Sequence, residues 1–500
     1  IQAKKESGKK FIICQIPYTW PKKIFDKLDK NLKIGFDPKL FTSDTLFKYF
    51  GNTCDLTPIN IDIFKKKTNK IVNENYFFTL SKKITGRSTI SKINSVIKLM
   101  KKQKINHLFI SSGENVCWLL NIRGKDLPNS PVANCQAILS SDGLINFFSN
   151  KKKIKKIKKK FKKNKIIFHD EDKLFDILNL IKNGTFCIDN QTCSIFNENL
   201  IKSKFNIKKK EDPIYKLKSI KNNVEIKNMI KAHIEDGVAL TKFIYWIKNI
   251  KNIKLDELII EKKLEKFRKK NKNYLYPSFA TIAGSGPNGA IIHYKSNKKT
   301  NRKIYKKDLL LVDSGGQYKW GTTDVTRTIA FEKQKSKVKK LYTRVLKGHI
   351  AVALCNIKHE INGHNIDKKA RKSLNSVGLD YSHGTGHGVG FFLNVHEGPQ
   401  SISKNNYINL QEGMIVSNEP GYYVEGKFGI RIENLVFIKK NKQKLYFKNL
   451  TLAPLEKDLI DNKMLTKKEK DYLFQYNLET YSKLSPYLKN NERKWLAKLI

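Results

Sequence analysis

The hydrophobic pattern in the first part of the chain predicts strands and helices in alternation. Residues 32–36 (LKIGF) have a strand pattern, and a turn at Asp37-Pro38 precedes a helix expected to be capped near Ser43. Residues 87–112 predict an amphipathic helix followed by a strand. Two further strands are predicted in AILSSDGLINFFS (137–149), around its Ser-Asp-Gly turn. This order of elements is typical of an α/β unit.

A lysine-rich segment, KKKIKKIKKKFKKNK (151–165), allows two interpretations. Its composition is that of a nucleic-acid-binding or nuclear-targeting patch. However, Ile154, Ile157 and Phe161 fall on one helical stripe beneath a face of lysines. We therefore favour a solvated helix.

A long helix is predicted over residues 219–250, after a linker rich in lysine and aspartate. Its apolar stripe is expected to consist of Ile226, Met229, Ile230, Ile234 and Val238. Beyond about residue 280, glycine and histidine become concentrated, and strand patterns and turns follow one another closely. These changes place the last domain at residues 212–500, and 500 residues are too many for one ordinary core.

The chain is strongly basic, with 98 lysines and arginines against 45 acidic residues and a formal net charge of +53. Such a charge often indicates a nucleic-acid or anionic membrane partner. Lysine is spread over the whole chain, however, and we interpret it as a general compositional bias. No nucleic-acid partner is expected. Lysines also interrupt every apolar run before it reaches transmembrane length, so no membrane partner is expected either.

The seven cysteines form an odd set without a CxxC pair. This pattern is evidence against a disulfide framework and against a thiolate zinc site. It fits a reducing compartment, and we expect a cytoplasmic protein. The chain begins with Ile1, so an N-terminal targeting segment could be missing from it.

Two aspartates frame a glycine-rich turn in DLLLVDSGGQYKWGTTDVTRTIAF. Asp313 ends a predicted strand and Asp324 lies near the start of the next, so chain reversal can bring them side by side. Two neighbouring carboxylates would not both ionise unless a cation lay between them. Turn capping remains the alternative for each aspartate alone.

The stretch YSHGTGHGVGFFLNVHEGP (381–399) contains three histidines among five glycines. Its glycines argue against a regular helix and let the backbone pass close to an ion or a substrate. His383, His387 and His396 are therefore candidates, although a single histidine on such a loop is more often a structural hydrogen-bonding group.

Two glutamates complete the candidate site. Glu419 follows an apolar strand and directly precedes Pro420, which ends that strand. Glu433 lies in FGIRIENLVFI, where alternation predicts one continuous strand with Ile430, Ile432 and Asn434 on one side and Arg431, Glu433 and Leu435 on the other. Burial of such a carboxylate is costly unless a divalent ion lies beside it.

Together, Asp313, Asp324, His387, Glu419 and Glu433 form a hard, oxygen-rich donor set. Such a set suits two Mn²⁺, Co²⁺ or Fe²⁺ ions better than a structural zinc. Two ions that share a hydroxide provide a strong nucleophile at neutral pH. The residues alone therefore predict a hydrolytic dimetal site.

The same segments resemble the pita-bread metallopeptidases, the fold shared by methionine aminopeptidase, prolidase and aminopeptidase P. More narrowly, the chain resembles the eukaryotic cytosolic X-prolyl aminopeptidases. The similarity is carried by GPNGAIIHY, DSGGQYKWGTTDVTRT, VLKGHIAV, HGTGHGVGFFLNVHEGP, NEPGYY and FGIRIEN. It extends to ENVCWLLNIRG and PNSPV in the middle of the chain and to TLAPLEKDLID and LTKKEKDYL near its end.

This resemblance implies a role for each candidate residue. Asp324 and Glu433 would bridge two divalent ions, usually Mn²⁺, with Co²⁺, Zn²⁺ or Fe²⁺ as alternatives; Asp313 would hold one ion, and His387 with Glu419 the other. Glu419 would also act as the base. His293 and His396 would hydrogen-bond the scissile carbonyl oxygen, His383 would line the proline pocket, and Arg431 would sit beside the bridging glutamate. The implied reaction removes the N-terminal residue from peptides with proline in second position, by attack of the bridging hydroxide on the Xaa-Pro bond.

The implied fold class is α/β (α+β). Residues 212–500 would form the pita-bread catalytic domain with a C-terminal extension, and residues 71–211 a smaller creatinase-like α/β domain. Residues 1–70 would be the C-terminal part of a truncated first creatinase-like domain. The family also implies a homodimer.

Two other functions stay open from the sequence. Prolidase has the same five ligands but requires dipeptides, and the similarities in FFLNVHEGP and at the C-terminus speak against it. A non-catalytic pita-bread protein that binds partners through a basic surface is the second. It would have no physical reason to retain so many buried ionisable groups.

Overall fold

The structure, a computed structural model, describes residues 3, 7–16, 19–28, 32–59, 75–161, 165–250, 254–355, 361–442 and 444–500. The chain divides into two compact units. One comprises Ile1–Leu127 and Val132–Leu217, and the other comprises Pro128–Pro131 and Lys218–Ile500. The domain boundary predicted between residues 70 and 71 lies outside the described residues.

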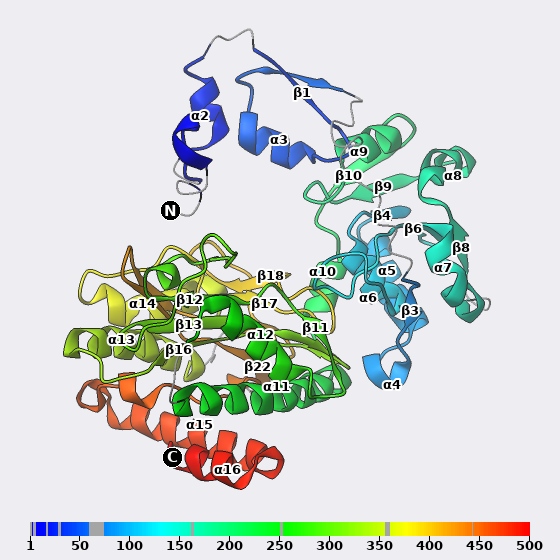
Figure 1. The fold of residues 1–500 in the computed structure, drawn as a ribbon. Helices are drawn as coiled ribbons and strands as arrows, with labels where there is room; N and C mark the ends of the chain where they lie inside the picture. The colour runs from blue at the N-terminus through cyan, green and yellow to red at the C-terminus, as the bar shows by residue number, and fades with distance from the viewer. Residues whose placement is uncertain are drawn as a thin grey trace. The chain divides into compact units, whose positions relative to one another are not determined.

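The first unit is built on a mixed six-stranded sheet with the strand order β10-β9-β4-β6-β7-β8 (Figure 1). β4 pairs in parallel with β9 and antiparallel with β6, while β7 and β8 are parallel. The strands are β4 (His107–Ile110), β6 (Gln136–Ser140), β7 (Ile145–Phe148), β8 (Ile166–His169), β9 (Thr185–Ile188) and β10 (Asn206–Lys209). The accompanying helices are α4 (Lys82–Thr85), α5 (Thr89–Lys102), α6 (Gly113–Leu120), α7 (Lys151–Lys158), α8 (Leu174–Leu180), α9 (Ile195–Lys202) and α10 (Ile214–Ser219). β3 (Phe78–Thr79) pairs with β5 (Ile122–Arg123).

The N-terminal part of this unit contains α2 (Pro21–Phe25) and α3 (Ser43–Phe50) beside two parallel strands, β1 (Lys33–Phe36) and β2 (Asp55–Pro58). α3 is capped near Ser43, as predicted: the cap is the adjacent Thr42, whose hydroxyl accepts the Thr45 amide at 3.2 Å.

The lysine-rich segment is helical, as predicted. α7 buries Ile154 and Ile157, and Phe161 is buried in the turn that follows. Its lysines are mostly exposed, which confirms the solvated helix over the described part of the segment; residues 162–164 lie outside that part. The predicted strands over 137–149 and the helix and strand over 87–112 are also present, as β6, β7, α5 and β4.

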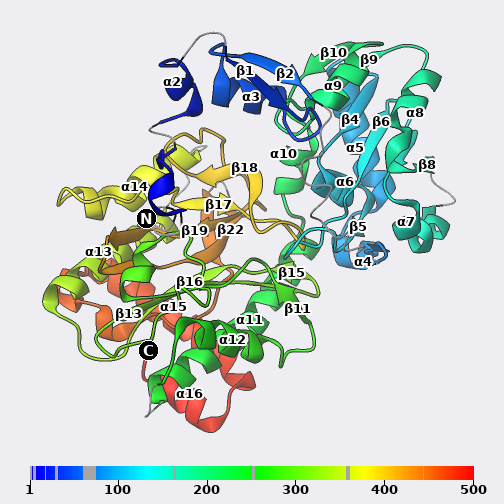
Figure 2. The ribbon, with the colours of Figure 1, turned by 45° about the horizontal axis from the view of Figure 1, so that its top comes forward.

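The second unit contains several small sheets (Figure 2). One three-stranded sheet has the order β12-β13-β16, and a five-stranded sheet has the order β18-β17-β19-β22-β23. β20 pairs with β21, and β14 lies between β11 and β15. The strands are β11 (Tyr274–Pro277), β12 (Ile282–Ser285), β13 (Leu309–Ser314), β14 (Gly316–Tyr318), β15 (Gly321–Thr322), β16 (Val325–Ala330), β17 (Gly386–Gly388), β18 (Glu397–Ile402), β19 (Ile415–Asn418), β20 (Gly421–Val424), β21 (Phe428–Arg431), β22 (Asn434–Asn441) and β23 (Lys444–Asn449).

Helices cover these sheets through separate apolar clusters. α11 (Asn223–Asn249) and α12 (Glu257–Arg268) pack on the sheet of β12, β13 and β16, where Phe243 and Leu264 contact the same cluster as Leu310. α13 (Ser336–Ala353) and α14 (Gly363–Asn375) share a second cluster with β19 and β22. Burial of these side chains is the main stabilising contribution to the unit.

The buried face of α11 differs from the predicted stripe. Met229 is fully buried, but Ile226 and Ile230 are only partly so. The helix instead buries a polar residue, Asp236, which accepts hydrogen bonds from Arg268 at 2.7 Å and from the Tyr318 hydroxyl at 2.8 Å. A prediction from hydrophobic residues alone misses a polar residue that is buried with hydrogen-bonding partners. The predicted buried face of α11 was therefore rotated about the helix axis from the observed one.

The predicted strand through FGIRIENLVFI is broken. β21 ends at Arg431 and β22 begins at Asn434, because the chain passes from the β20–β21 hairpin into the five-stranded sheet. The prediction of one continuous alternating strand was therefore wrong. The break leaves Ile432 and Glu433 between the two ladders, where the Glu433 amide donates to the Thr326 carbonyl at 3.2 Å.

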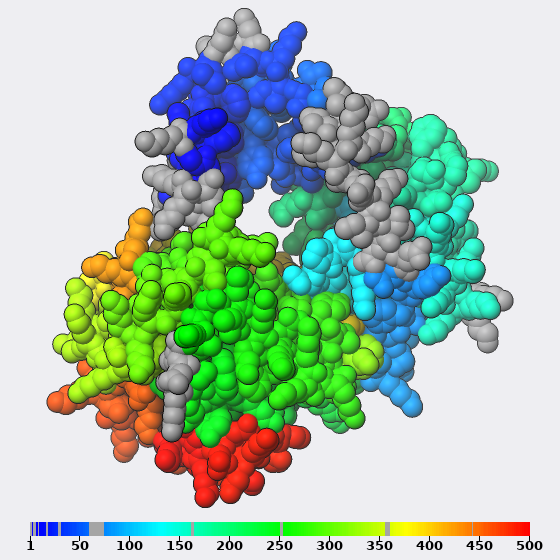
Figure 3. Space-filling model, in the orientation of Figure 1, coloured from blue at the N-terminus to red at the C-terminus, as the bar shows by residue number. Residues whose placement is uncertain are grey.

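The C-terminal segment forms α15 (Lys467–Leu484) and α16 (Asn490–Ala497), which contact α11 (Figure 3). Leu484 and Leu496 are buried there, with Ile234 and Val238 packed against their cluster. No described helix combines the length and the apolar character that crossing a bilayer would need.

Candidate dimetal active site

All the predicted site residues line one cavity of about 410 Å³ in the second unit. They are His293, Asp313, Asp324, His383, His387, His396, Glu419, Arg431 and Glu433. The cavity wall also contains the apolar side chains of Phe279, Ile282 and Ile292. Convergence of so many ionisable side chains in one cavity beside an apolar wall is typical of a functional site.

Strand ends and strand breaks place the acidic groups. Asp313 pairs with Thr326 in the β13–β16 ladder, and Asp324 directly precedes β16. Glu419 follows β19, and Glu433 occupies the break between β21 and β22. Asp313 thus lies within a ladder, whereas Asp324, Glu419 and Glu433 lie just outside one. Although they come from three sheets, all four line the same cavity.

Three overlapping groups of possible ligands share members: Asp313, Asp324 and Glu433; His387, Glu419 and Glu433; and Asp324, His387 and His396. Within each group the donor atoms lie within 4.8 Å of one another. His387 Nε2 lies 3.3 Å from Asp324 Oδ2 and 3.5 Å from Glu419 Oε1. Each group shares a residue with the others, as expected if two cations bind side by side.

The donor set has unused coordinating capacity. Asp313 Oδ1 and Asp324 Oδ1 are buried, and neither has a hydrogen-bond partner among the described residues. His387 Nδ1 lies 2.9 Å from the Gly388 carbonyl; an N–H there would donate to it and leave Nε2 free to coordinate. Buried carboxylate oxygens without partners are costly, and a divalent cation removes that cost. The residues present therefore fit a pair of divalent ions.

The electrostatics of the cavity lead to the same conclusion. Burial, together with the nearby Asp313 and Glu419, raises the pKa of Asp324 well above its usual value. Burial and the neighbouring acids, Asp324 first among them, also raise the pKa of Glu433 strongly. The pKa of Glu419 is raised by burial. Each of these acids would be ionised more readily beside a cation.

Arg431 supports the acidic cluster from one side. Its Nη2 donates to Asp313 Oδ2 at 2.6 Å, and its Nε lies 3.2 Å from the Thr326 hydroxyl. That hydroxyl donates to Glu433 Oε2 at 2.7 Å. Arg431 thus contacts Asp313 directly and reaches Glu433 through Thr326.

The histidines lie around the acidic cluster. The His387 and His396 rings are 4.1 Å apart between centroids, and His293 also lines the cavity. Desolvation, followed by the charges of His387 and His293, lowers the pKa of His396 to about 4. Near neutral pH, His396 is therefore a neutral imidazole that can donate one N–H.

Tyr423 is a site residue that sequence reasoning missed. Its hydroxyl accepts from Arg431 Nη1 at 2.7 Å and lies 2.9 Å from His383 Nε2. Burial first, and then Arg431, lower the pKa of His383 to about 3, so the neutral ring can accept a hydrogen bond from the Tyr423 hydroxyl. A signal was present: in the β20–β21 hairpin, Tyr423 pairs with Gly429, two residues from Arg431 on the same face.

Ser417 was also missed. Its hydroxyl donates to Glu419 Oε1 at 2.9 Å and accepts the His387 amide at 2.8 Å. It therefore connects the predicted base to the strand that carries the predicted histidine ligand. Its position one residue before Asn418 in an apolar strand gave no sequence signal.

The chain is similar to known families over nearly its whole length. Residues 227–440 match metallopeptidase family M24, residues 69–225 match the creatinase/prolidase N-terminal domain, and residues 443–499 match the C-terminal region of peptidase M24. Xaa-Pro aminopeptidase 1 of Dictyostelium discoideum is 40% identical over 513 residues, which cover 95% of this chain and 81% of that protein. Aminopeptidase P2 of Arabidopsis thaliana is 33% identical over 99% of this chain and 78% of its own length.

Solved structures show the same relationship. The X-prolyl aminopeptidase of Caenorhabditis elegans, described as a cytosolic enzyme with a di-nuclear active site, superposes with a TM-score of 0.88. It is 29% identical, and the match covers 95% of this chain and 82% of that one. A prolidase from Thermococcus sibiricus has a TM-score of 0.61 and 27% identity over 74% of this chain and 98% of its own.

Proposed function

The chain belongs to the Xaa-Pro aminopeptidases of metallopeptidase family M24, and we propose that its cavity residues remove the N-terminal residue from peptides with proline in second position. It is a metal-dependent X-prolyl aminopeptidase that combines a creatinase-type N-terminal domain with a pita-bread catalytic domain. Two divalent ions belong to its active site. What supports the residue assignment most is that every predicted side chain lines one cavity.

In this proposal, Asp313, Asp324, His387, Glu419 and Glu433 would hold the ions, and Asp324 and Glu433 would contribute to both. Asp324, His387 and Glu433 each belong to two of the three possible ligand groups. When bound, the ions supply Lewis acidity and a nucleophile from water at neutral pH. Mn²⁺ is the proposed metal, because a set of carboxylates with one imidazole suits it. Co²⁺, Zn²⁺ and Fe²⁺ are the alternatives to be compared in activity assays.

The protein side chains perform the remaining steps. Glu419, held by Ser417, takes the proton of the attacking water. His293 and His396 donate hydrogen bonds to the scissile carbonyl oxygen as negative charge develops on it. His383 lines the pocket for the proline ring, and Arg431 fixes Asp313.

A substrate panel tests the activity. With Mn²⁺ added, an Xaa-Pro-Pro peptide with a free amine is expected to lose its first residue. The N-acetylated peptide, an Xaa-Pro dipeptide and an Xaa-Ala peptide are expected to react at least about 100-fold more slowly, because a specific site rejects groups it cannot pair. Mass spectrometry of the products, before and after chelation, measures this.

Each alternative gives a different result in the same panel. Cleavage of the dipeptide alone would identify a prolidase. Activity that survives complete chelation would contradict the metal-dependent assignment. If no substrate is cleaved although metal is bound, the result would favour the non-catalytic protein that only binds partners.

We further propose a cytoplasmic homodimer. The cysteines support the compartment, because all of them are free and most are buried. The homodimer rests on the family resemblance, and light scattering on the purified protein tests it.

The assignment of residues 71–211 to the creatinase-like domain and of residues 212–500 to the catalytic domain is likewise a proposal, supported by the matched ranges. The assignment of residues 1–70 stays a prediction.

A further inference from the structure

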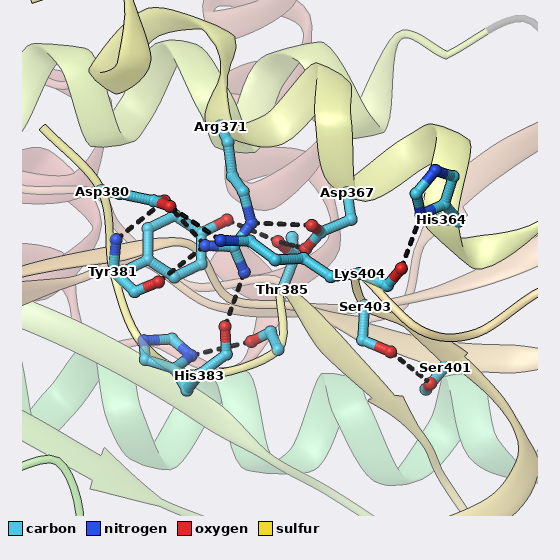
Figure 4. A network of polar contacts seen from close by, with 11 residues as sticks. His364, Asp367, Arg371, Asp380, Tyr381, His383, Thr385, Ser401, Ser403 and Lys404 are labelled. Atoms are coloured by element: carbon cyan, nitrogen blue, oxygen red, sulfur yellow. Dashed lines mark hydrogen bonds and ion pairs between the residues drawn. The ribbon is translucent and has the colours of Figure 1, made fainter. Parts of the chain in front are cut away.

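A buried arginine behind the cavity holds the glycine-rich loop that carries His383 (Figure 4). Arg371 lies on α14 and is 3% exposed. Its guanidinium donates to Asp367 Oδ2, to Asp380 Oδ1 and to the main-chain carbonyls of Tyr381 and His383, each at 2.7 Å. One side chain thus joins a helix to several points of the loop.

The same network ties the far end of the loop. The Thr385 hydroxyl donates to Asp367 Oδ1 at 2.6 Å and is also hydrogen-bonded to the Tyr381 hydroxyl. The Arg371 guanidinium carbon lies 3.9 Å from the centroid of the Tyr381 ring, within the range of a cation–π contact. Residues 381–385 are therefore fixed at both ends to a single Asp367–Arg371 pair on α14.

The fixed loop has two connections to the cavity. His383 Nε2 lies 2.9 Å from the Tyr423 hydroxyl oxygen, which Arg431 also contacts. The Thr385 carbonyl accepts the Glu419 amide at 2.8 Å. Arg371 itself is not among the residues that line the cavity, so it can act on substrate only through this loop.

Only arginine suits this position. A planar guanidinium has five donors in a fixed fork, whereas a lysine ammonium is a single point charge with three donors. Lysine would keep the charge that Asp367 needs, but it could not satisfy the carboxylates and both carbonyls together. The loop would then lose contacts to its backbone while the buried ion pair remained.

We propose that Arg371 is a positioning residue for proline recognition: it sets the place of the His383 wall of the proline pocket through the loop of residues 381–385. This inference rests on the proposed function, in which His383 lines that pocket. Displacement of the wall weakens contacts that substrate and transition state make equally. It therefore raises KM and leaves kcat and the metal ligands nearly unchanged.

The test compares Arg371→Lys with Arg344→Met. Arg344 serves as the control arginine, since it bonds to α14 near its C-terminal end, at the Ser373 carbonyl, at 2.9 Å, and does not line the cavity. For Arg371→Lys, KM for Xaa-Pro-Pro and the dissociation constant of the product Pro-Pro are both expected to rise about 10-fold. kcat, metal content and thermal unfolding should stay close to those of the control.

A second variant keeps the test decisive if Arg371→Lys does not fold. Thr385→Val removes the hydroxyl contact to Asp367 and retains the Thr385 carbonyl. It should raise both constants in the same direction by a smaller factor. Unchanged KM and Pro-Pro affinity in the folded variants would overturn the proposal, as would loss of kcat together with metal, which would indicate a purely structural role. If the unchanged protein does not cleave Xaa-Pro-Pro, the proposed function fails instead.

Discussion

Replacement of Glu419 by glutamine is expected to remove nearly all turnover and to leave the fold intact. Glutamine has the shape of glutamate and can still accept the hydrogen bond from Ser417, which is 2.9 Å long in the structure. It cannot take a proton from the attacking water. Loss of a general base should lower kcat by about 10²- to 10⁴-fold, measured on the free-amine Xaa-Pro-Pro peptide at saturation.

The metal content of the variant must be measured in parallel, because Glu419 is also a proposed ligand. A variant that binds both ions and is inactive supports the base, whereas one that has lost an ion shows only that the ligand matters. Glu425→Gln is the matched control, since Glu425 is exposed in the turn of the neighbouring β20–β21 hairpin. Full activity in Glu419→Gln would refute the proposed base.

Several candidate residues could be predicted because they have a local signal in the sequence. Asp313 is the penultimate residue of an apolar strand, Glu419 directly follows another, and His387 lies on a glycine-rich stretch where ordinary side chains would not fit. A Cβ on Gly386 would meet the Ser417 carbonyl oxygen at 1.9 Å, so the glycine there is required by close backbone approach. These signals lie within a few residues of the side chain that they identify.

The supporting contacts could not be predicted in the same way, because they join segments far apart in the chain. Thr326 reaches Glu433, and Arg371 reaches the His383 carbonyl, only after the sheets and α14 have packed. The strand break at Ile432 and Glu433 has a similar origin, since the hydrophobic alternation continues through it while the hydrogen-bonding partner changes. The alternation of side chains along a strand predicts only which of its two sides is buried. Both sides of this segment are buried, so the alternation did not reveal the break.

Asp324→Asn is expected to change metal-dependent activity and metal-free stability in opposite directions. As a proposed ligand of both ions, Asp324 would be needed to hold them, so its loss should lower kcat/KM at least about 100-fold. In the metal-free protein the same carboxylate, when ionised, destabilises the native state. Its pKa is raised first by burial and then by Asp313 and Glu419.

The direction of the pH dependence follows from that raised pKa. Between the ordinary aspartate pKa of about 3.9 and the higher folded-state value, the native protein holds a proton that the unfolded chain has released. The native state is therefore destabilised progressively as pH rises through this window, by about 1.4 kcal/mol per pH unit for a full proton. Asparagine does not ionise and escapes the loss. The variant's advantage should accordingly grow with pH and persist above the window.

Urea unfolding with a chelator present, at about pH 5 and about pH 7.5, measures the effect as a difference between variant and unchanged protein. The difference removes the titration of the buried histidines, which both proteins share. Asp471→Asn, on the exposed face of α15, controls for loss of a negative charge alone. A free energy of unfolding that is lower in Asp324→Asn than in the unchanged metal-free protein at about pH 7.5 would contradict the prediction. It would mean that the acidic cluster is stabilised by contacts within the protein, and that relief of carboxylate repulsion is not what drives metal binding.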